Sequence, residues 1–158
     1  MRYTTSNYHA DLNNSPPINF LLIPMAALIN PFLSNAEKIL FGYFDDLSWK
    51  IHIDNKQLKH IVNLKNEAEV EYCIKQLEAA GYINISYINE KMYIQSVKNL
   101  NTYYNKILIY YNDIMENYCG ATIDEFYGNI YDLFYVTMKE YCPNFNFSGR
   151  EKETNQCK

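Results

Sequence analysis

With 158 residues, the chain is long enough for one compact core and too short for two ordinary domains. Hydrophobic residues make up 48% of it, and only five glycines and five prolines interrupt them, which excludes a largely disordered chain. The net charge of -4 gives no global attraction for phosphate, so any contact with nucleic acid has to come from a local basic face.

The cysteines and the N-terminal apolar run indicate in which cellular compartment the protein is expected. None of the four cysteines has CxxC spacing and no secretory leader is recognisable, so we expect a reduced, cytoplasmic protein. The apolar run 18–29 is about a dozen residues long, against the roughly 20 that cross a bilayer, and Pro24 interrupts it. We therefore expect a buried lead-in segment and no membrane contact.

The first predicted elements follow a polar segment, residues 1–17, which we expect to be flexible. Ser34 and Glu37 form a capping box, and apolar residues then recur at steps of three and four up to Leu47, which predicts an amphipathic helix. Alternation of bulky and polar residues over 49–53 predicts a brief strand. Asp54 can cap the helix that follows, over 55–62, with Leu58 and Ile61 buried.

A second helix follows the turn 63–65. Asn66 and Glu69 mark its start and Gly81 its end. The residues expected on its buried stripe are Val70, Cys73, Ile74 and Leu77, whereas Ala68, Tyr72, Lys75 and Ala79 are expected to face outward. Alternation over 82–87 and 91–95, with Asn89 and Glu90 between, predicts a β-hairpin.

Helical spacing returns from Leu100 and predicts two further helices. Gly120 ends the first, and a capping box of Thr122 and Glu125 begins the second, which runs to about Tyr141. These helices should form an antiparallel helical hairpin over 98–142, followed by a disordered tail, 143–158. The residues expected on their buried faces are Tyr103, Tyr104, Ile107, Leu108, Tyr111, Ile114, Met115 and Tyr118 in the first, and Phe126, Ile130, Leu133, Phe134 and Met138 in the second.

The fold class is thus mainly α, of the α+β kind. The order of elements over 18–97 resembles the winged helix-turn-helix domains of bacterial regulators and of phage or plasmid replication proteins. The motifs that carry the resemblance are the run 20–24, the segment 30–38 and the run 77–83, which reads Leu-Glu-Ala-Ala-Gly-Tyr-Ile. The helical hairpin lies outside the resemblance.

The resemblance implies binding of double-stranded DNA by a regulator or replication accessory, with the helix after Asn66 in a major groove and the hairpin against phosphates. A homodimer formed through residues 98–142 would read paired half-sites. The residues that could contact DNA are Lys56, Lys59, Lys65, Tyr72, Lys75, Gln76 and Lys91.

The charge of the helix after Asn66 supports an alternative. Glu67, Glu69 and Glu71 stand where a DNA-reading helix would offer basic groups, and carboxylates near phosphate are repelled. Together with Tyr72 they could dock on a basic protein surface, as an inhibitor or adaptor encoded by a mobile element does when it mimics phosphate. Acids in a first helical turn also simply stabilise the helix.

The sequence predicts neither an enzyme nor a cofactor or metal site. It lacks a phosphate-binding glycine loop, HExxH and GxSxG. The tyrosine pairs at 103–104 and 110–111 could suggest a nicking nucleophile, but His9, His52 and His60 are isolated, so we interpret the pairs as core residues.

Overall fold

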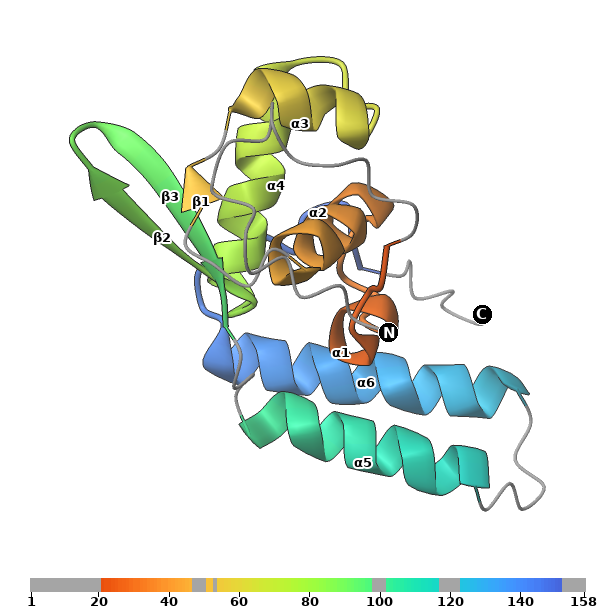
Figure 1. Cartoon of the computed structure of the whole chain (residues 1–158). Helices are drawn as coiled ribbons and strands as arrows, with labels where there is room; N and C mark the ends of the chain where they lie inside the picture. Colours follow the sequence, from red (N-terminus) through yellow and green to blue (C-terminus); the bar gives the residue numbers. More distant parts are fainter. Residues whose placement is uncertain (1–20, 47–50, 53, 98–101, 117–122, 152–158) are drawn as a thin grey trace.

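The computed structural model describes residues 21–46, 51–52, 54–97, 102–116 and 123–151. The chain is mainly helical with a small antiparallel sheet, which confirms the α+β class (Figure 1). The expected flexible segment 1–17, most of the strand 49–53, the Gly120 and Thr122 signals and residues 152–158 lie outside the described residues. In chain order the elements are α1 (Met25–Leu28), α2 (Asn35–Asp46), β1 (Ile51–His52), α3 (Asn55–Ile61), α4 (Glu67–Ala79), β2 (Ile83–Ile88), β3 (Lys91–Ser96), α5 (Thr102–Glu116) and α6 (Ile123–Tyr141).

The lead-in segment is only partly buried. Pro24 precedes α1, whose Ala26 and Ala27 are buried, whereas Leu22 and Leu28 are about half exposed. The four-residue helix turns once and then stops, so only one side of it meets the rest of the protein. The expectation that this whole run is buried was therefore wrong.

Helix α2 begins at the expected capping box. The backbone N–H of Glu37 donates to Ser34 Oγ at 3.2 Å, and the N–H of Ser34 donates to Glu37 Oε2 at 2.9 Å. These two bonds satisfy amides that have no partner within the helix. Leu40, Phe41 and Phe44 then face the core.

Helices α3 and α4 are also defined by local signals. Asp54 accepts from Lys56 N at 2.8 Å, and Asn66 accepts from Glu69 N at 2.9 Å. Gly81, at φ 80°, ends α4 through a Schellman motif in which Tyr82 N donates to Leu77 O at 3.0 Å. The four residues of the predicted α4 stripe are buried.

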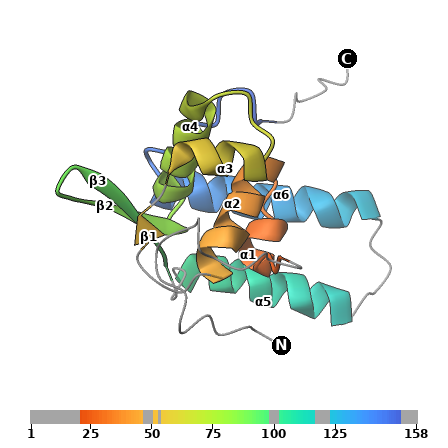
Figure 2. The ribbon, with the colours of Figure 1, turned by 45° about the horizontal axis from the view of Figure 1, so that its top comes forward.

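The sheet has the strand order β1-β3-β2, and both pairings are antiparallel. Ile94 of β3 lies opposite Ile85 of β2 and Ile51 of β1, so the two-residue strand β1 extends the hairpin to a three-stranded sheet. Asn89 and Glu90 have φ of 49° and 64°, the conformation of a type I′ turn. The hairpin projects from the helices (Figures 1 and 2).

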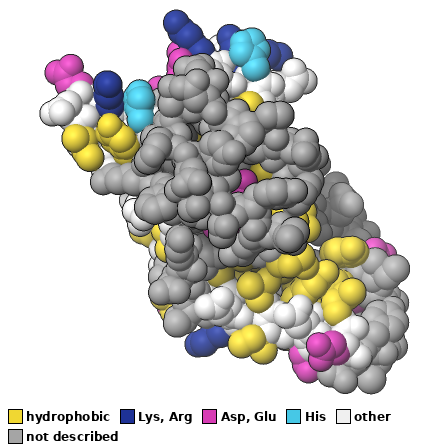
Figure 3. All heavy atoms as spheres, viewed as in Figure 1, with side chains coloured by type: hydrophobic (Ala, Val, Ile, Leu, Met, Phe, Trp, Pro, Cys, Tyr) yellow, Lys and Arg dark blue, Asp and Glu magenta, His cyan; other side chains and the backbone are white. Residues whose placement is uncertain are grey.

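Helices α5 and α6 run antiparallel beneath the other elements (Figure 1). Tyr104, Ile107, Phe126, Ile130 and Phe134 are buried as predicted. Met115 was expected on the buried face of α5 but is 57% exposed. Apolar side chains remain visible over these helices in Figure 3.

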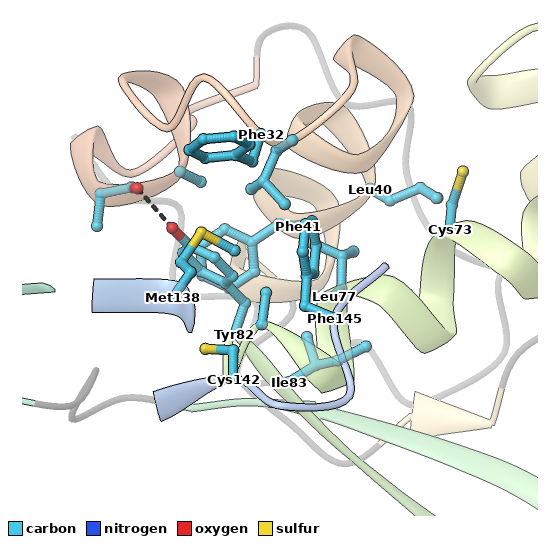
Figure 4. Packing of buried hydrophobic residues seen from close by; sticks show 14 of the residues in the cluster. Phe32, Leu40, Phe41, Cys73, Leu77, Tyr82, Ile83, Met138, Cys142 and Phe145 are labelled. Carbon is cyan, nitrogen blue, oxygen red and sulfur yellow. Dashed lines mark hydrogen bonds between the residues drawn. The ribbon is translucent and has the colours of Figure 1, made fainter. Parts of the chain in front are cut away.

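The core gathers around Tyr82, the residue that follows Gly81. Its ring stacks on Tyr104 with centroids 4.9 Å apart, and its hydroxyl donates to Ala26 O at 2.7 Å (Figure 4). Asn30 Nδ2 in turn donates to the Tyr82 hydroxyl at 3.0 Å. Because one side chain joins α1, α4 and α5, the helical hairpin and the sheet share one core.

Residues 142–151, called here the C-terminal segment, correct the prediction of a disordered tail from residue 143. Phe145 and Phe147 are 5% and 9% exposed, and their ring centroids lie 4.9 Å apart. Arg150 reaches the fully buried Glu37, with Nη1 donating to Oε2 at 2.5 Å and Nη2 donating to Oε1 at 2.6 Å. Two aromatic anchors and a buried ion pair therefore hold the segment in place.

Candidate docking groove

A groove lies between the N-terminal half of α4, the start of α3 and the outer end of the hairpin. Its volume is about 450 Å³. The hairpin, whose Ile85, Met92 and Ile94 pack against the core, projects away from the helices (Figures 1 and 2). The lining residues are His52, Asp54, Asn55, Glu67, Glu71, Tyr87, Glu90, Lys91 and Met92.

The hairpin supplies the apolar side of this groove. Side chains alternate between the two faces of a strand, so Tyr87 and Met92 share the face on which Ile85 and Ile94 contact the core. Tyr87 lies opposite Met92 in the ladder, and it is 66% exposed. On the inner face of the hairpin Tyr87 is thus exposed, beside Met92, which is half-buried and packs against the core.

Helix α4 supplies an acidic side. Glu67 and Glu71 are four residues apart, so their side chains lie one above the other on one flank of the helix. Glu71 Oε1 accepts from Lys75 Nζ at 2.8 Å. That hydrogen bond and the charge of Glu71 raise the pKa of Lys75, and Tyr87 adds to the shift. The ammonium group therefore lies beside Glu71, next to the groove and outside its lining.

The groove has an excess of acceptors. Four carboxylates, those of Asp54, Glu67, Glu71 and Glu90, line it together with one ammonium, that of Lys91. His52 Nδ1 lies 3.1 Å from Met92 O. The buried side-chain oxygen of Asn55 has no hydrogen-bond partner among the described residues. The charge of the groove suits a cationic ligand and opposes phosphate.

The two residue sets predicted from sequence are only partly brought together. Lys56, Lys59 and His60 lie on α3, and Lys65 lies in the turn after it. Lysine or arginine and histidine side chains are visible together at the top of Figure 3. Lys91 lies in the groove, and Lys75 is paired with Glu71. The five lysines do not form one surface.

The remaining two predicted DNA contacts are engaged by the C-terminal segment. Gln76 is 7% exposed, and its Oε1 accepts from Asn146 N at 2.8 Å. Asn146 Nδ2 donates to the Tyr72 hydroxyl at 3.1 Å, and the Arg150 guanidinium lies 5.7 Å from the Tyr72 ring centroid. Gln76 is therefore unavailable to DNA, and Tyr72 is only partly available.

The predicted protein-binding set divides between two flanks of α4. Glu67 and Glu71 line the groove, whereas Glu69 accepts from Lys65 N at 2.9 Å and serves the helix start. Tyr72 belongs with the C-terminal segment. Tyr87 and Glu90 were not predicted as site residues, although strand alternation places Tyr87 on the same face as Ile85.

Other kinds of site are not evident in the described part of the chain. No three His, Cys, Asp or Glu side chains there could together hold a metal ion. None of the helices described is both long and apolar enough to cross a bilayer. Tyr104, one of the paired tyrosines, is a core residue whose hydroxyl donates to Ala80 O at 2.6 Å.

Comparison of the chain with known protein families, with curated proteins and with solved structures finds no match.

Proposed function

We propose that residues 21–97 form a winged helix-turn-helix and that its groove docks on a basic surface of a partner protein. The order α2, β1, α3, α4, β2, β3 supports the fold proposal, with α4 in the place of the recognition helix and the hairpin as the wing. The observation that carries the functional proposal is the acidic groove between those two elements. A DNA-binding winged helix would present basic groups there.

The C-terminal segment supports the same proposal. It contacts Tyr72 and Gln76 on the flank of α4 that faces away from the groove. A helix covered on that flank cannot enter a major groove without displacing the segment, whereas the Glu67 and Glu71 flank stays open. Docking through the acidic flank therefore requires no rearrangement, and the protein would act as an adaptor or an inhibitor of an enzyme with a basic channel.

The test uses two defined probes, a fluorescent arginine-rich peptide of twelve residues and a duplex of matched charge. Wild-type protein should bind the peptide, and replacing both Glu67 and Glu71 with lysine should weaken that binding by at least tenfold while strengthening duplex binding. Duplex binding by the wild type that exceeds peptide binding at the same salt concentration would refute the proposal.

DNA binding by a regulator or replication accessory is the second candidate. The observation that favours it is the cluster of Lys56, Lys59, His60 and Lys65, which can contact phosphates without α4 entering a groove. Replacing Lys56, Lys59 and Lys65 with glutamine should abolish duplex binding under this hypothesis and leave peptide binding unchanged under the first. The two functions are thus separated by variants on different elements.

A further inference from the structure

We propose that the docking groove seats the side chain of an arginine from an extended segment of the partner, with the guanidinium between the Tyr87 ring and the Glu67 and Glu71 carboxylates. The inference rests on the proposed function, because it names the group that a basic partner inserts. It also states that the groove recognises one kind of side chain and does not merely attract positive charge.

The aromatic side of the groove is the first argument. Tyr87 is 66% exposed although it lies on the inner face of the hairpin, and Met92 lies beside it as an apolar surface. A guanidinium group is planar and weakly hydrated, so it stacks on an aromatic face, and the methylene stem of arginine packs on apolar atoms. One ligand side chain can satisfy Tyr87 and Met92 together.

The acceptors form the second argument. A guanidinium has five N–H donors in a fixed fork and no acceptor. The groove offers the carboxylates of Glu67 and Glu71 one helical turn apart. A ligand rich in donors fits this set, whereas phosphate would add more acceptors to it.

Lys75 supplies the third argument, because it shows that a cation already pairs with Glu71 beside the groove. Its ammonium lies 2.8 Å from Glu71 Oε1, and the pair is exposed, with 59% and 51% of the two side chains accessible. Such an exposed pair is weak and exchanges easily. A ligand lysine would only replace one ammonium with another, whereas an arginine adds stacking and a second hydrogen bond.

The size of the groove suits one inserted side chain and is too small for a whole helix to enter. An α-helix is about 10–12 Å across with its side chains. The space of about 450 Å³, lined by residues of helices, strands and the hairpin turn, accommodates one long side chain and its neighbouring backbone. We therefore assign an extended segment, not a helix, as the occupant.

The experiment compares three labelled peptides of glycine and serine that carry two arginines, two lysines or two citrullines. Citrulline keeps the shape of arginine and removes its charge. On the full chain, the arginine peptide should bind roughly tenfold more tightly than the citrulline peptide and several-fold more tightly than the lysine peptide. Equal affinity for arginine and lysine would overturn the inference.

Variants then locate the site. Glu71→Gln and Tyr87→Leu should each weaken binding of the arginine peptide about three- to tenfold, and Lys75→Gln should strengthen it because Glu71 loses its resident cation. Asp132→Asn and Lys106→Gln make the same charge changes on α6 and α5, at exposed positions away from the groove. Both controls should leave the affinity within about twofold.

The outcomes separate this inference from the proposed function. If the arginine-rich twelve-residue peptide binds and the Glu67 and Glu71 lysine variant abolishes that binding, but Tyr87→Leu matches the wild type, the docking surface stands and the arginine seat is wrong. If no basic peptide binds, both fail. Far-ultraviolet circular dichroism of each variant establishes that a loss of binding is not a loss of fold, and an exposed residue such as Tyr87 can be replaced without a cavity.

Discussion

At the scale of single residues, Glu37 has two roles, and its partners in them, Ser34 and Arg150, lie more than a hundred positions apart in the sequence. Its carboxylate closes the capping box of α2 and also receives the forked pair of hydrogen bonds from Arg150. Burial lowers the pKa of Arg150, but the hydrogen bonds and charge of Glu37 outweigh this effect and raise the pKa above its ordinary value. The Arg150 guanidinium therefore stays charged within the protein, with Glu37 as its partner.

Removing one partner should be far more costly than changing a surface pair. We expect Arg150→Met to lower the free energy of unfolding by roughly 3–5 kcal/mol, because it leaves the Glu37 carboxylate buried and uncompensated. In a Glu37→Gln background the same change should cost less than half as much. Urea denaturation measures both values, and Glu151→Gln, at an exposed pair with Lys139, should cost about 1 kcal/mol or less. Equal losses at the two pairs would contradict this account.

Cys73 gives a second prediction at this scale. Burial and then the Glu37 carboxylate raise the pKa of its thiol to about 11 from 9.0. The unfolded thiol ionises near 9.0, so the folded state keeps a proton that the unfolded state loses. The associated stability is complete below pH 9 and is lost as the pH rises to about 11.

Wild-type protein should therefore lose about 1–3 kcal/mol more stability between pH 8 and 11 than Cys73→Ala does. The comparison is needed because tyrosines and lysines also titrate in this range, and they are the same in both proteins. Denaturation midpoints at four or five pH values provide the measurement. Parallel stability curves for the two proteins would show that Cys73 is not the responsible group.

At the scale of elements, the hairpin turn carries a local cost. Glu90 has φ 64° in the type I′ turn, a conformation that glycine adopts without penalty and a residue with a Cβ does not. Glu90→Gly should stabilise the protein by about 0.5–1 kcal/mol in chemical denaturation. As a control, Glu90→Gln removes the charge and keeps the Cβ, so it should leave the stability nearly unchanged. If Glu90→Gln stabilises the protein as much as Glu90→Gly does, the charge of Glu90 and not its backbone conformation is responsible.

The elements that sequence predicted well are those fixed by neighbours in the chain. Capping residues, the Schellman glycine and the period of the α4 stripe act over a few residues, and the structure has each of them. The incorrect predictions concern which side of a helix is buried. Ile61 was expected to be buried but is 45% exposed, because Val62 instead faces the core after the turn of α3. Which of two adjacent apolar residues is covered depends on what packs there, and periodicity does not contain that information.

The C-terminal segment and the groove were missed for a related reason. Phe145 and Phe147 alternate over only three positions in a polar stretch, too short a pattern to predict a structure. The partner of Arg150 is Glu37, which the sequence assigns to a capping box. The acids of α4 were recognised, but strand alternation gives only the face on which Tyr87 lies; how far the core covers that face, and so the exposure of Tyr87, depends on tertiary packing.

At the scale of the whole molecule, the C-terminal segment decides which flank of α4 is open. It returns from the end of α6 and joins α4 through Gln76 and α2 through Glu37, so the last described residues close over the first helices. The opposite flank, with Glu67 and Glu71, faces the groove. With one covered flank and one open acidic flank, α4 would offer the partner of the proposed function a single direction of approach.

Two truncations test the structural role of this segment. A chain that ends at Tyr141 should lose more than about 4 kcal/mol, because burial of Phe145 and Phe147 contributes roughly 1.5–3 kcal/mol each and Glu37 loses its only cation among the described residues. Since domains of this size have total stabilities of about 5–15 kcal/mol, the shortened chain should be marginally folded or unfolded. A chain that ends at Glu151 keeps every contact described for the segment and should unfold at the wild-type urea concentration. If both chains unfold like the full-length protein, residues 142–151 contribute nothing to stability and leave α4 open on both flanks. That result would favour the DNA-binding hypothesis for α4.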